Sequence, residues 1–357
     1  MHTKIKELLD LAINNKASDV HIVSGILPKL RVNGELIDVG NFENNKELMD
    51  EMILSILEAN QIDVLKKDKE LDYSLDVGIA RFRVNVYYQQ GNLGCAMRVI
   101  PLIIPNMDEL NLPEVIQSLV NLRQGFVLIT GPTSHGKSTT VASILNEINL
   151  KKAVHIVTVE DPIEYLIKPV KSIVSQRELG TDTISFVNGL RSCLRQDPNV
   201  LFVGEMRDLE TISSAMTIAE TGHLVFSTLH TNSASQTVDR IIDIFPEGAK
   251  NQVRSQLASV LSVVISERLV RSNSGELLPA FEIMINNSAI KNAIRDNKTY
   301  VIDNVIQTSV EMGMMTLEMS LAKLVKNGQV NEDTAESYVM RPADFKGYLR
   351  DISQVKR

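Results

Sequence analysis

The sequence predicts an α/β fold, in which a P-loop core follows a smaller α+β domain. Strands alternate with helices from Asn111 onward, which is typical of a parallel sheet. Residues 131–139 fit the pattern G-x-x-x-x-G-K-[ST], preceded by an apolar run and followed by helical periodicity. At 357 residues, 44% of them hydrophobic, the chain is long enough for two folded domains.

The first hundred residues read as the α+β domain. Residues 3–14 and 47–58 each place apolar side chains on one face of a helix. Asn33-Gly34 between two short apolar runs, 29–32 and 35–37, predicts a hairpin. Further strands are expected at 18–23, 71–76, 80–88 and 95–100. We therefore expect domain one at 1–100, a linker at 101–111 and the core at 112–357.

The core is expected to contain a parallel sheet. Strands are predicted at 126–129, 155–159, 199–205 and 224–228, and helices at 139–148, 183–195 and 208–220. Beyond Ser233 the chain reads as mostly helical, with helices at 237–243, 250–269, 288–295 and 316–327. Ligands of open parallel sheets bind beyond the carboxyl ends of the strands. The P-loop, Glu160, Glu205 and His230 all follow such ends, which predicts one shared site.

The P-loop itself predicts a nucleotide site. Its glycine-rich turn lets backbone N–H groups close around phosphate oxygens, and the helix that follows adds its positive end. Lys137 should reach the β- and γ-phosphates, Ser138 should ligate Mg²⁺, and His135 should present only its backbone. ATP and Mg²⁺ are the expected cofactors. The expected contacts are Gly131, Pro132, Thr133, Ser134, His135, Gly136, Lys137, Ser138 and Thr139.

Other polar residues at the strand ends are candidates for chemistry. Glu205 follows an apolar strand, in the Walker B position, where a carboxylate holds the metal through water or polarises the attacking water. The alternative for Glu205 is a solvated strand end, and for Glu160 a plain turn. His230 lies in a polar run suited to sensing a γ-phosphate, whereas His223 is equally well explained as a structural residue.

Composition excludes several classes of protein. The net charge of −7 provides no basic field for nucleic acid, and no partner of that kind is expected. The two cysteines, Cys95 and Cys193, lack the spacing of metal ligands and suit a reducing compartment. No apolar run approaches the roughly 18 to 20 residues of a transmembrane helix. We therefore expect a cytoplasmic protein.

Together these motifs resemble those of the secretion ATPases of type IV pili and type II secretion, most of all the pilus retraction ATPases. The resemblance extends along essentially the whole chain. It is carried by residues 17–21, 81–85, the P-loop, 159–165 (the family's Asp box), 203–208 (Walker B), 221–232 (the His box) and 307–317.

The resemblance implies a PAS-like N-terminal domain, a RecA-like ATPase core and a homohexamer. It assigns catalysis to Glu205, metal and water support to Glu160, and γ-phosphate sensing to His230 with His223. Arg83 and Arg98, with Arg81, would reach the nucleotide as charge stabilisers; from their position on a sheet alone, a solvated face was the simpler explanation. ATP-driven domain rotation would power pilus retraction through an inner-membrane platform protein, at which the motor is peripherally bound, with a paralogous retraction ATPase as a further partner.

The chain departs from the family's usual pattern at two places. Ser134-His135 replaces Gly-Ser in the P-loop, and turnover should change if residue 134 needs a positive φ. The C-terminal stretch tied to retraction is shortened to residues 293–296. A pilus assembly or type II secretion ATPase, a nucleotide-binding scaffold with little turnover, and a nucleic-acid motor are the alternative interpretations.

Overall fold

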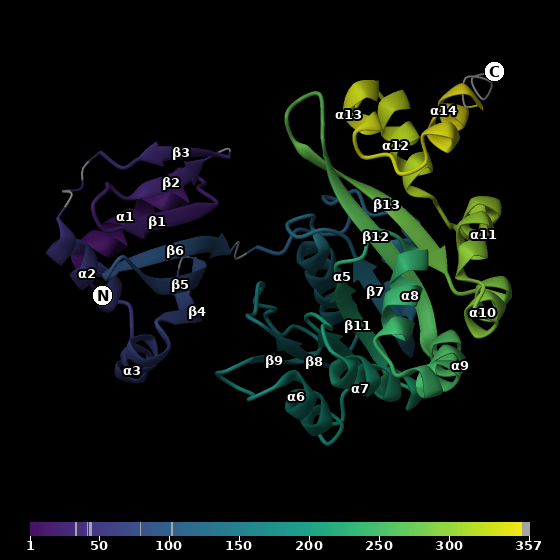
Figure 1. Ribbon diagram of the computed structural model, residues 1–357, viewed down its shortest axis with the longest axis horizontal. Coiled ribbons are helices and arrows are strands. Elements are labelled where there is room, and N and C mark those ends of the chain that lie inside the picture. The colour runs from purple at the N-terminus through teal and green to yellow at the C-terminus, as the bar shows by residue number, and fades with distance from the viewer. Residues whose placement is uncertain (33, 41, 43–44, 79, 101–102, 352–357) are drawn as a thin grey trace. The chain divides into compact units, whose positions relative to one another are not determined.

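The computed structural model describes residues 1–32, 34–40, 42, 45–78, 80–100 and 103–351 (Figure 1). Asn33 of the predicted hairpin, residues 101–102 of the predicted linker and residues 352–357 of the predicted core lie outside the described residues. The chain divides into two compact units, one of Met1–Ile103 with Pro162–Leu166, the other of Ile104–Asp161 with Ile167–Arg357.

The first unit is built on a six-stranded antiparallel sheet in the order β3-β2-β1-β6-β5-β4. Its strands are β1 (Asp19–Val23), β2 (Lys29–Val32), β3 (Glu35–Asp38), β4 (Glu70–Asp76), β5 (Arg81–Gln89) and β6 (Asn92–Ile100). Its helices are α1 (Thr3–Asn14), α2 (Lys46–Leu54) and α3 (Ala59–Asp68). Helix α1 has the predicted bounds, and its apolar face packs into the core of this unit. Helix α3 was not predicted, because Leu65 is the only side chain that this helix buries.

The second unit is built on a seven-stranded sheet in the order β13-β12-β7-β11-β10-β8-β9. Adjacent strands are parallel, except that β13 runs antiparallel to β12. The strands are β7 (Gly125–Thr130), β8 (His155–Glu160), β9 (Ile173–Glu178), β10 (Val200–Val203), β11 (Leu224–Leu229), β12 (Leu261–Arg271) and β13 (Leu277–Ile285). This sheet confirms the predicted α/β class.

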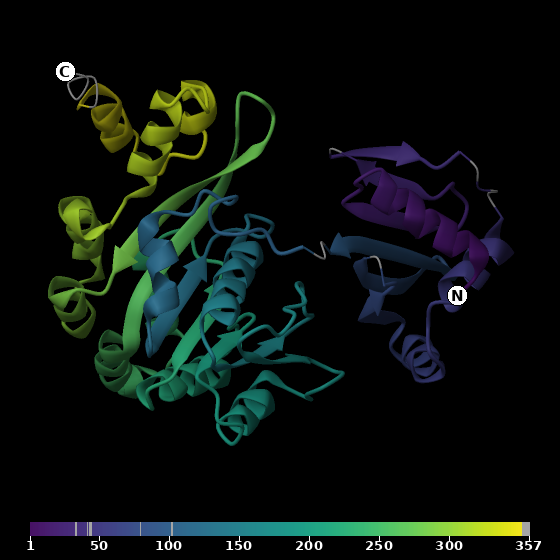
Figure 2. The ribbon, with the colours of Figure 1, turned by 180° about the vertical axis from the view of Figure 1, so that it is seen from behind.

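Helices surround the sheet of the second unit (Figures 1 and 2). They are α4 (Glu114–Ser118), α5 (Lys137–Lys151), α6 (Phe186–Cys193), α7 (Leu209–Glu220), α8 (Ala234–Asp243), α9 (Lys250–Val260), α10 (Ser288–Arg295), α11 (Ile302–Thr308), α12 (Leu317–Lys326), α13 (Glu332–Glu336) and α14 (Pro342–Asp351). Short 3₁₀ turns occupy Leu119–Asn121, Glu247–Ala249, Thr299–Val301 and Val310–Met312.

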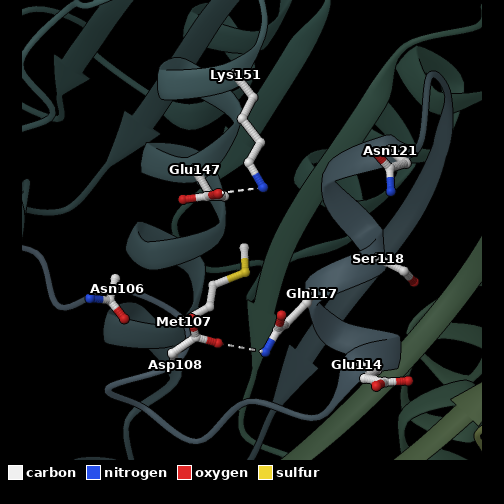
Figure 3. A pocket seen from close by; sticks show the side chains of 9 residues that line it. All are labelled: Asn106, Met107, Asp108, Glu114, Gln117, Ser118, Asn121, Glu147 and Lys151. Atoms are coloured by element: carbon white, nitrogen blue, oxygen red, sulfur yellow. Dashed lines mark hydrogen bonds and ion pairs between the residues drawn. The ribbon is translucent and has the colours of Figure 1, made fainter.

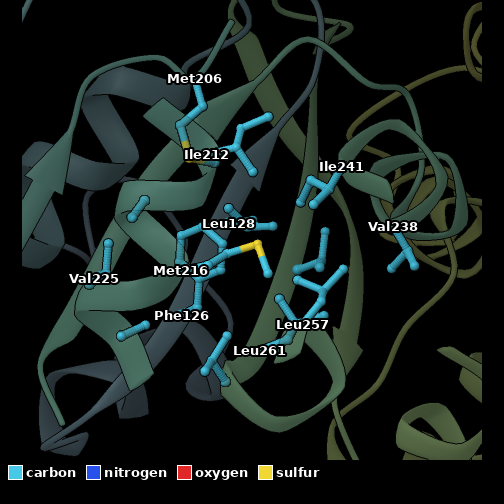
Figure 4. Close-up of a cluster of buried hydrophobic side chains, with 14 of the residues drawn as sticks. Phe126, Leu128, Met206, Ile212, Met216, Val225, Val238, Ile241, Leu257 and Leu261 are labelled. Carbon is cyan, nitrogen blue, oxygen red and sulfur yellow. The ribbon is translucent and has the colours of Figure 1, made fainter. Parts of the chain in front are cut away.

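Separate apolar clusters pack against the two faces of this sheet. On one face, helices α6 to α11 contribute to a cluster in which Leu128 of β7 meets Met216 of α7 and Leu257 of α9 (Figure 4). On the other, Val127 and Ile129 of β7 pack with Ile144 of α5. The residues of β7 are apolar almost throughout, as expected for a strand that is buried on both faces. The P-loop that follows it is therefore held by a rigid central strand.

The predicted helix over 250–269 is wrong in its second half. Helix α9 ends at Val260, and the chain continues as β12, which pairs with β7 on one side and β13 on the other. The run Val263-Val264-Ile265 is β-branched, and all three side chains are buried, which suits a central strand better than a helix. Strand β13 was not predicted either, since everything beyond Ser233 was expected to be mostly helical.

Smaller differences have local causes. The helix predicted at 183–195 begins only at Phe186, because Ser185 caps it by accepting a hydrogen bond from Asn188 N. Strand β9 was missed. It is an edge strand, where pairing on one side and an exposed Ile173 weaken the apolar pattern.

Candidate functional site

The P-loop connects the buried strand β7 to the N-terminus of α5. Gly136 caps α5 with φ of 92°, and Gly131 has φ of 141°, conformations that favour glycine. Lys137 and Ser138 occupy the first turn of the helix, where backbone N–H groups lack helical partners and the helix dipole favours an anion. The loop therefore has the geometry of a phosphate-binding turn.

The Lys137 ammonium lies across this loop. It donates to the carbonyl oxygens of Gly131 and Pro132 over 2.8 and 2.7 Å, and its Nζ is 3.5 Å from His230 Nδ1. Lys137 is only 7% exposed, although it is charged. The structure thus brings together the predicted P-loop lysine and the predicted sensor histidine.

The two unusual residues of the loop behave differently from each other. Ser134 has φ of 63°, so the position does require the left-handed conformation, which costs a non-glycine residue about 1 to 2 kcal/mol. His135 uses its side chain, contrary to the expectation that only its backbone matters. Its Nδ1 accepts a hydrogen bond from Leu269 N over 2.8 Å. Burial, then the charges of Arg268 and Lys137, lower the pKa of His135, so the ring is a neutral acceptor.

Glu205 lies beyond the end of β10, within reach of two basic side chains. Its carboxylate accepts from Arg207 over 2.8 Å, and its Oε1 lies 3.0 Å from His230 Nε2. Burial pushes the pKa of Glu205 upward, but the hydrogen bond from Arg207 and the interaction with His230 outweigh burial and hold the pKa below its usual range. Lys137, His230 and Glu205 therefore form one connected row of side chains.

Glu160 is the last residue of β8, the strand that neighbours β10. Its Oε1 accepts from Thr158 Oγ1 over 2.6 Å and from Gln176 Nε2 over 3.2 Å, and the residue is 7% exposed. Gly204 packs against the backbone of Glu160, where a Cβ would come 3.3 Å from Glu160 Cα. Glycine at 204 thus lets the ends of β8 and β10 approach closely.

His223 lies at the opposite end of β11 from His230. It precedes β11, whereas His230 follows it, and seven residues of strand span roughly 23 Å. His223 Nδ1 lies 3.0 Å from Thr221 Oγ1, and its carbonyl accepts from Gly125 N at the start of β7. The chain therefore does not bring His223 and His230 to the same nucleotide site.

The three predicted arginines belong to the first unit. Arg81 and Arg83 lie on β5 and Arg98 on β6, with Arg83 directly opposite Arg98 in the register. Arg98 is exposed and forms an ion pair with Asp19 over 3.0 Å. The remaining predicted contacts lie in the P-loop itself, where Thr133 is exposed and Thr139 is half-buried.

Sequence reasoning missed two residues beside the P-loop, Glu267 of β12 and Thr140 of α5. Thr140 Oγ1 donates to Glu267 Oε2 over 2.9 Å, and both residues are almost completely buried. The strand pattern of 263–265 was a signal for a strand here, but not for its position beside β7.

A separate polar pocket lies at the far end of α5 (Figure 3). Glu147 and Lys151 of α5 form an ion pair there, and Gln117 donates to Asp108 over 3.2 Å. Helix α5 rises roughly 20 Å between Lys137 and Lys151, so this pocket is distinct from the P-loop.

Among the described residues, no group of three or more His, Cys, Asp or Glu side chains is arranged to hold a metal ion. Within the same residues, no helix combines the length and apolar character that crossing a membrane requires.

Comparison with known proteins identifies the family. Residues 1–276 match the family described as "Type II/IV secretion system protein". The chain is 42% identical to the type IV pilus retraction ATPase PilT of Pseudomonas aeruginosa, over 96% of this chain and 99% of that protein. It is 43% identical to a twitching motility protein of Neisseria gonorrhoeae, over 86% of this chain and 83% of that protein.

A solved structure agrees with these relatives. The crystal structure of the pilus retraction motor PilT with bound ADP matches with a TM-score of 0.90 and 41% identity, over 96% of this chain and 98% of that one. The match confirms the RecA-like α/β class that the sequence resemblance implied. The chain belongs to the type II/IV secretion system protein family, and within it to the pilus retraction ATPases.

Proposed function

We propose that this chain is the ATP-hydrolysing motor that drives retraction of a type IV pilus, working as a homohexamer. Two relatives, which the match covers over 99% and 83% of their lengths, are named pilus retraction ATPase and twitching motility protein. The observation that carries the chemistry is the row of Lys137, His230 and Glu205, with neighbouring side chains 3.5 and 3.0 Å apart. Such a row links a phosphate-binding cation to a carboxylate able to orient water.

Each residue of this row has a chemical role in the proposal. Lys137 binds the β- and γ-phosphates of ATP and neutralises charge as the terminal bond breaks. Glu205 is ionised, because its pKa is held low, so it can accept a hydrogen bond or a proton from the attacking water. His230 orients Glu205 and contacts the γ-phosphate. Arg207 keeps Glu205 charged.

The chain also offers donors of the kind that Mg²⁺ prefers. The Ser138 hydroxyl and the carboxylates of Glu160 and Glu205 are hard oxygen ligands, at the first turn of α5 and at two neighbouring strand ends. We assign Mg²⁺ to these residues together with the nucleotide's own oxygens. When bound, the ion would neutralise charge on the β- and γ-phosphates.

The first domain completes the motor in this proposal. We assign residues 1–100 to this domain, with a PAS-like fold. A linker at 101–111 joins it to the core at 112–357. Arg83 and Arg98, with Arg81, would bind the nucleotide held between subunits of the hexamer. Nucleotide-driven rotation between the two domains would be transmitted to the pilus.

The proposed partners follow from the same role. The hexamer would bind peripherally to an inner-membrane platform protein from the cytoplasm, so that pilin subunits leave the base of the fibre. A paralogous retraction ATPase would act beside it, and no nucleic acid is involved.

An ATPase assay tests the chemistry. Glu205→Ala should lower the steady-state rate at least roughly a hundredfold, since it removes the group that orients water. Glu210→Ala, which truncates an exposed glutamate of α7, is the matched control and should retain the wild-type rate. The same background rate in wild type and Glu205→Ala would instead identify a nucleotide-binding scaffold.

Deletion of the gene tests the direction of the motor. Cells without a retraction motor should carry excess surface pili and fail to twitch. Cells without pili would contradict retraction and indicate assembly.

A further inference from the structure

Strand β12 extends beyond the end of β7 and runs beside the P-loop. It pairs with β7 as far as Ser266, which lies opposite Thr130, the last residue of β7. There β7 ends and the P-loop begins, whereas β12 continues to Arg271. The residues after Ser266 therefore accompany the phosphate loop on the side where β7 has ended, while on the other side they stay paired with β13.

Contacts join this extension of β12 to the P-loop along its length. The hydroxyls of Thr130 and Ser266 are 2.8 Å apart, and Leu269 N donates to His135 Nδ1. A Cβ on Gly131 would overlap the carbonyl oxygen of Glu267. The loop thus rests on the backbone of β12, and its first residue is glycine because nothing larger fits there.

The side chain of Glu267 reaches the start of α5. Its Oε2 accepts from Thr140 Oγ1 over 2.9 Å, and a Cβ on Gly136 would come 2.5 Å from its Oε1. Glu267 is 3% exposed and Thr140 1%. The carboxyl therefore fills the space between the residue that caps the helix and the residue one turn later.

We propose that Glu267 is a positioning residue of the nucleotide site, whose carboxyl holds the first turn of α5 so that Lys137 and Ser138 face the phosphates. Lys137 and Ser138 lie in the chain between Gly136 and Thr140, the two residues that Glu267 contacts. This turn therefore cannot rotate without losing one of those contacts. The inference rests on the proposed function, because it concerns the nucleotide that the P-loop binds.

The charge state of Glu267 suits this position. Burial raises its pKa to about 8, although the hydrogen bond from Thr140 and the charge of Lys137 act to lower it. Near neutral pH the carboxyl is therefore mostly protonated. A neutral acid can hold the turn without repelling the anionic phosphates that bind on the other side of it.

Titration of the full-length protein with MgADP tests the proposal. Glu267→Ala should weaken MgADP binding and lower kcat/KM for ATP by about tenfold each, the effect expected when a buried hydroxyl loses its partner. Glu267→Gln keeps the shape and the acceptor and should recover both to within about threefold of wild type. Thr140→Val should weaken binding by several fold. In the Glu267→Ala background, Thr140→Val should not weaken MgADP binding further, because both substitutions remove the same hydrogen bond.

A control on another buried glutamate separates positioning from general destabilisation. Glu318 of α12 is fully buried and binds Arg341, so Glu318→Gln changes an equally buried acid elsewhere. It should leave MgADP binding within about twofold of wild type. Wild-type affinity in Glu267→Ala, equal weakening in Glu318→Gln, or additive effects of Glu267→Ala and Thr140→Val would overturn the proposal.

Two further outcomes remain interpretable. If Glu267→Ala does not fold, Thr140→Val tests the proposal instead, because it removes the hydrogen bond to Glu267 and keeps the shape of the threonine side chain. Wild-type MgADP affinity in Thr140→Val would then overturn the proposal. If the wild type binds MgADP but hydrolyses no ATP, the proposed function fails, while the MgADP titrations still test Glu267.

Discussion

Glu205 and Glu267 are both close to the P-loop, yet their surroundings are opposite. The Glu205 side chain is 22% exposed, contacts Arg207 and His230, and has a lowered pKa. Glu267 is 3% exposed, has a hydroxyl for its hydrogen-bond partner, and has a pKa raised to about 8. The same carboxyl group is therefore kept charged where water must be activated, and neutral where a turn must be supported.

The largest expected effect comes from replacing the Glu205 carboxyl with an amide. Glu205→Gln should reduce kcat by roughly a hundredfold to a thousandfold, because the amide cannot accept a proton from water. MgADP affinity should fall far less than kcat, because Lys137 and the loop amides still bind the phosphates although one proposed Mg²⁺ ligand is lost. Single-turnover hydrolysis and MgADP titration provide the two readings.

The same substitution at Glu267 is the matched control for that comparison. Glu267→Gln should leave kcat within about threefold of wild type, because the carboxyl is already neutral near pH 7. Equal losses of turnover in the two variants would show that the two carboxyls do not differ in role.

The next effect is on stability as a function of pH. The folded chain keeps a proton on Glu267 up to about pH 8, whereas the unfolded chain releases it near 4.5. The free energy of unfolding should therefore fall as pH rises between these values, by about 5 kcal/mol, and level off above pH 8. The positive charge of Lys137 opposes this effect, because it lowers the pKa of Glu267.

Thermal unfolding of wild type and Glu267→Gln measures that dependence. The amide does not titrate, so its advantage over wild type should grow by several degrees between about pH 5 and pH 8. A constant difference across this range would mean that the Glu267 carboxyl is ionised in the folded protein.

A smaller gain is expected at Ser134, on the exposed part of the P-loop. Ser134→Gly removes the cost of a left-handed serine but adds freedom to the unfolded chain, so the net gain should be at most about 1 kcal/mol. Calorimetry should show a rise of roughly 2 °C. A lower melting temperature would show that the serine side chain stabilises the loop.

The smallest effect concerns Arg207, whose ion pair with Glu205 is largely exposed. Arg207→Ala should raise the pKa of Glu205 and so move the acid limb of the pH–rate profile to higher pH. At pH 8 the rate should fall less than about fivefold, the value of an exposed ion pair. An acid limb at the same pH would mean that Arg207 does not keep Glu205 charged.

The parts of the site that follow local rules could be predicted from the sequence. The P-loop is contiguous, so strand, glycine turn, Lys137 and helix are all visible in one segment. Glu205 and His230 were found because the ends of parallel strands meet at one edge of a sheet. The row that they form with Lys137 follows from that rule.

The parts of the site that depend on pairing between distant segments could not be predicted from the sequence. Helical periodicity was assigned to 261–269, and this hid β12 and therefore the contact between Glu267 and Thr140. His223 was grouped with His230 through the family resemblance, although the two residues lie at opposite ends of β11. Which strand borders β7 is decided by tertiary packing, which no short window of residues contains.

Strand β12 connects the nucleotide to the C-terminal helices over a very short stretch of chain. Glu267 supports the first turn of α5, and three residues later Val270 is buried among Leu317 and Leu321 of α12 and Phe345 of α14. A force on α12 and α14, from a bound partner for example, would therefore be transmitted to the P-loop through a segment of β12 about 10 Å long.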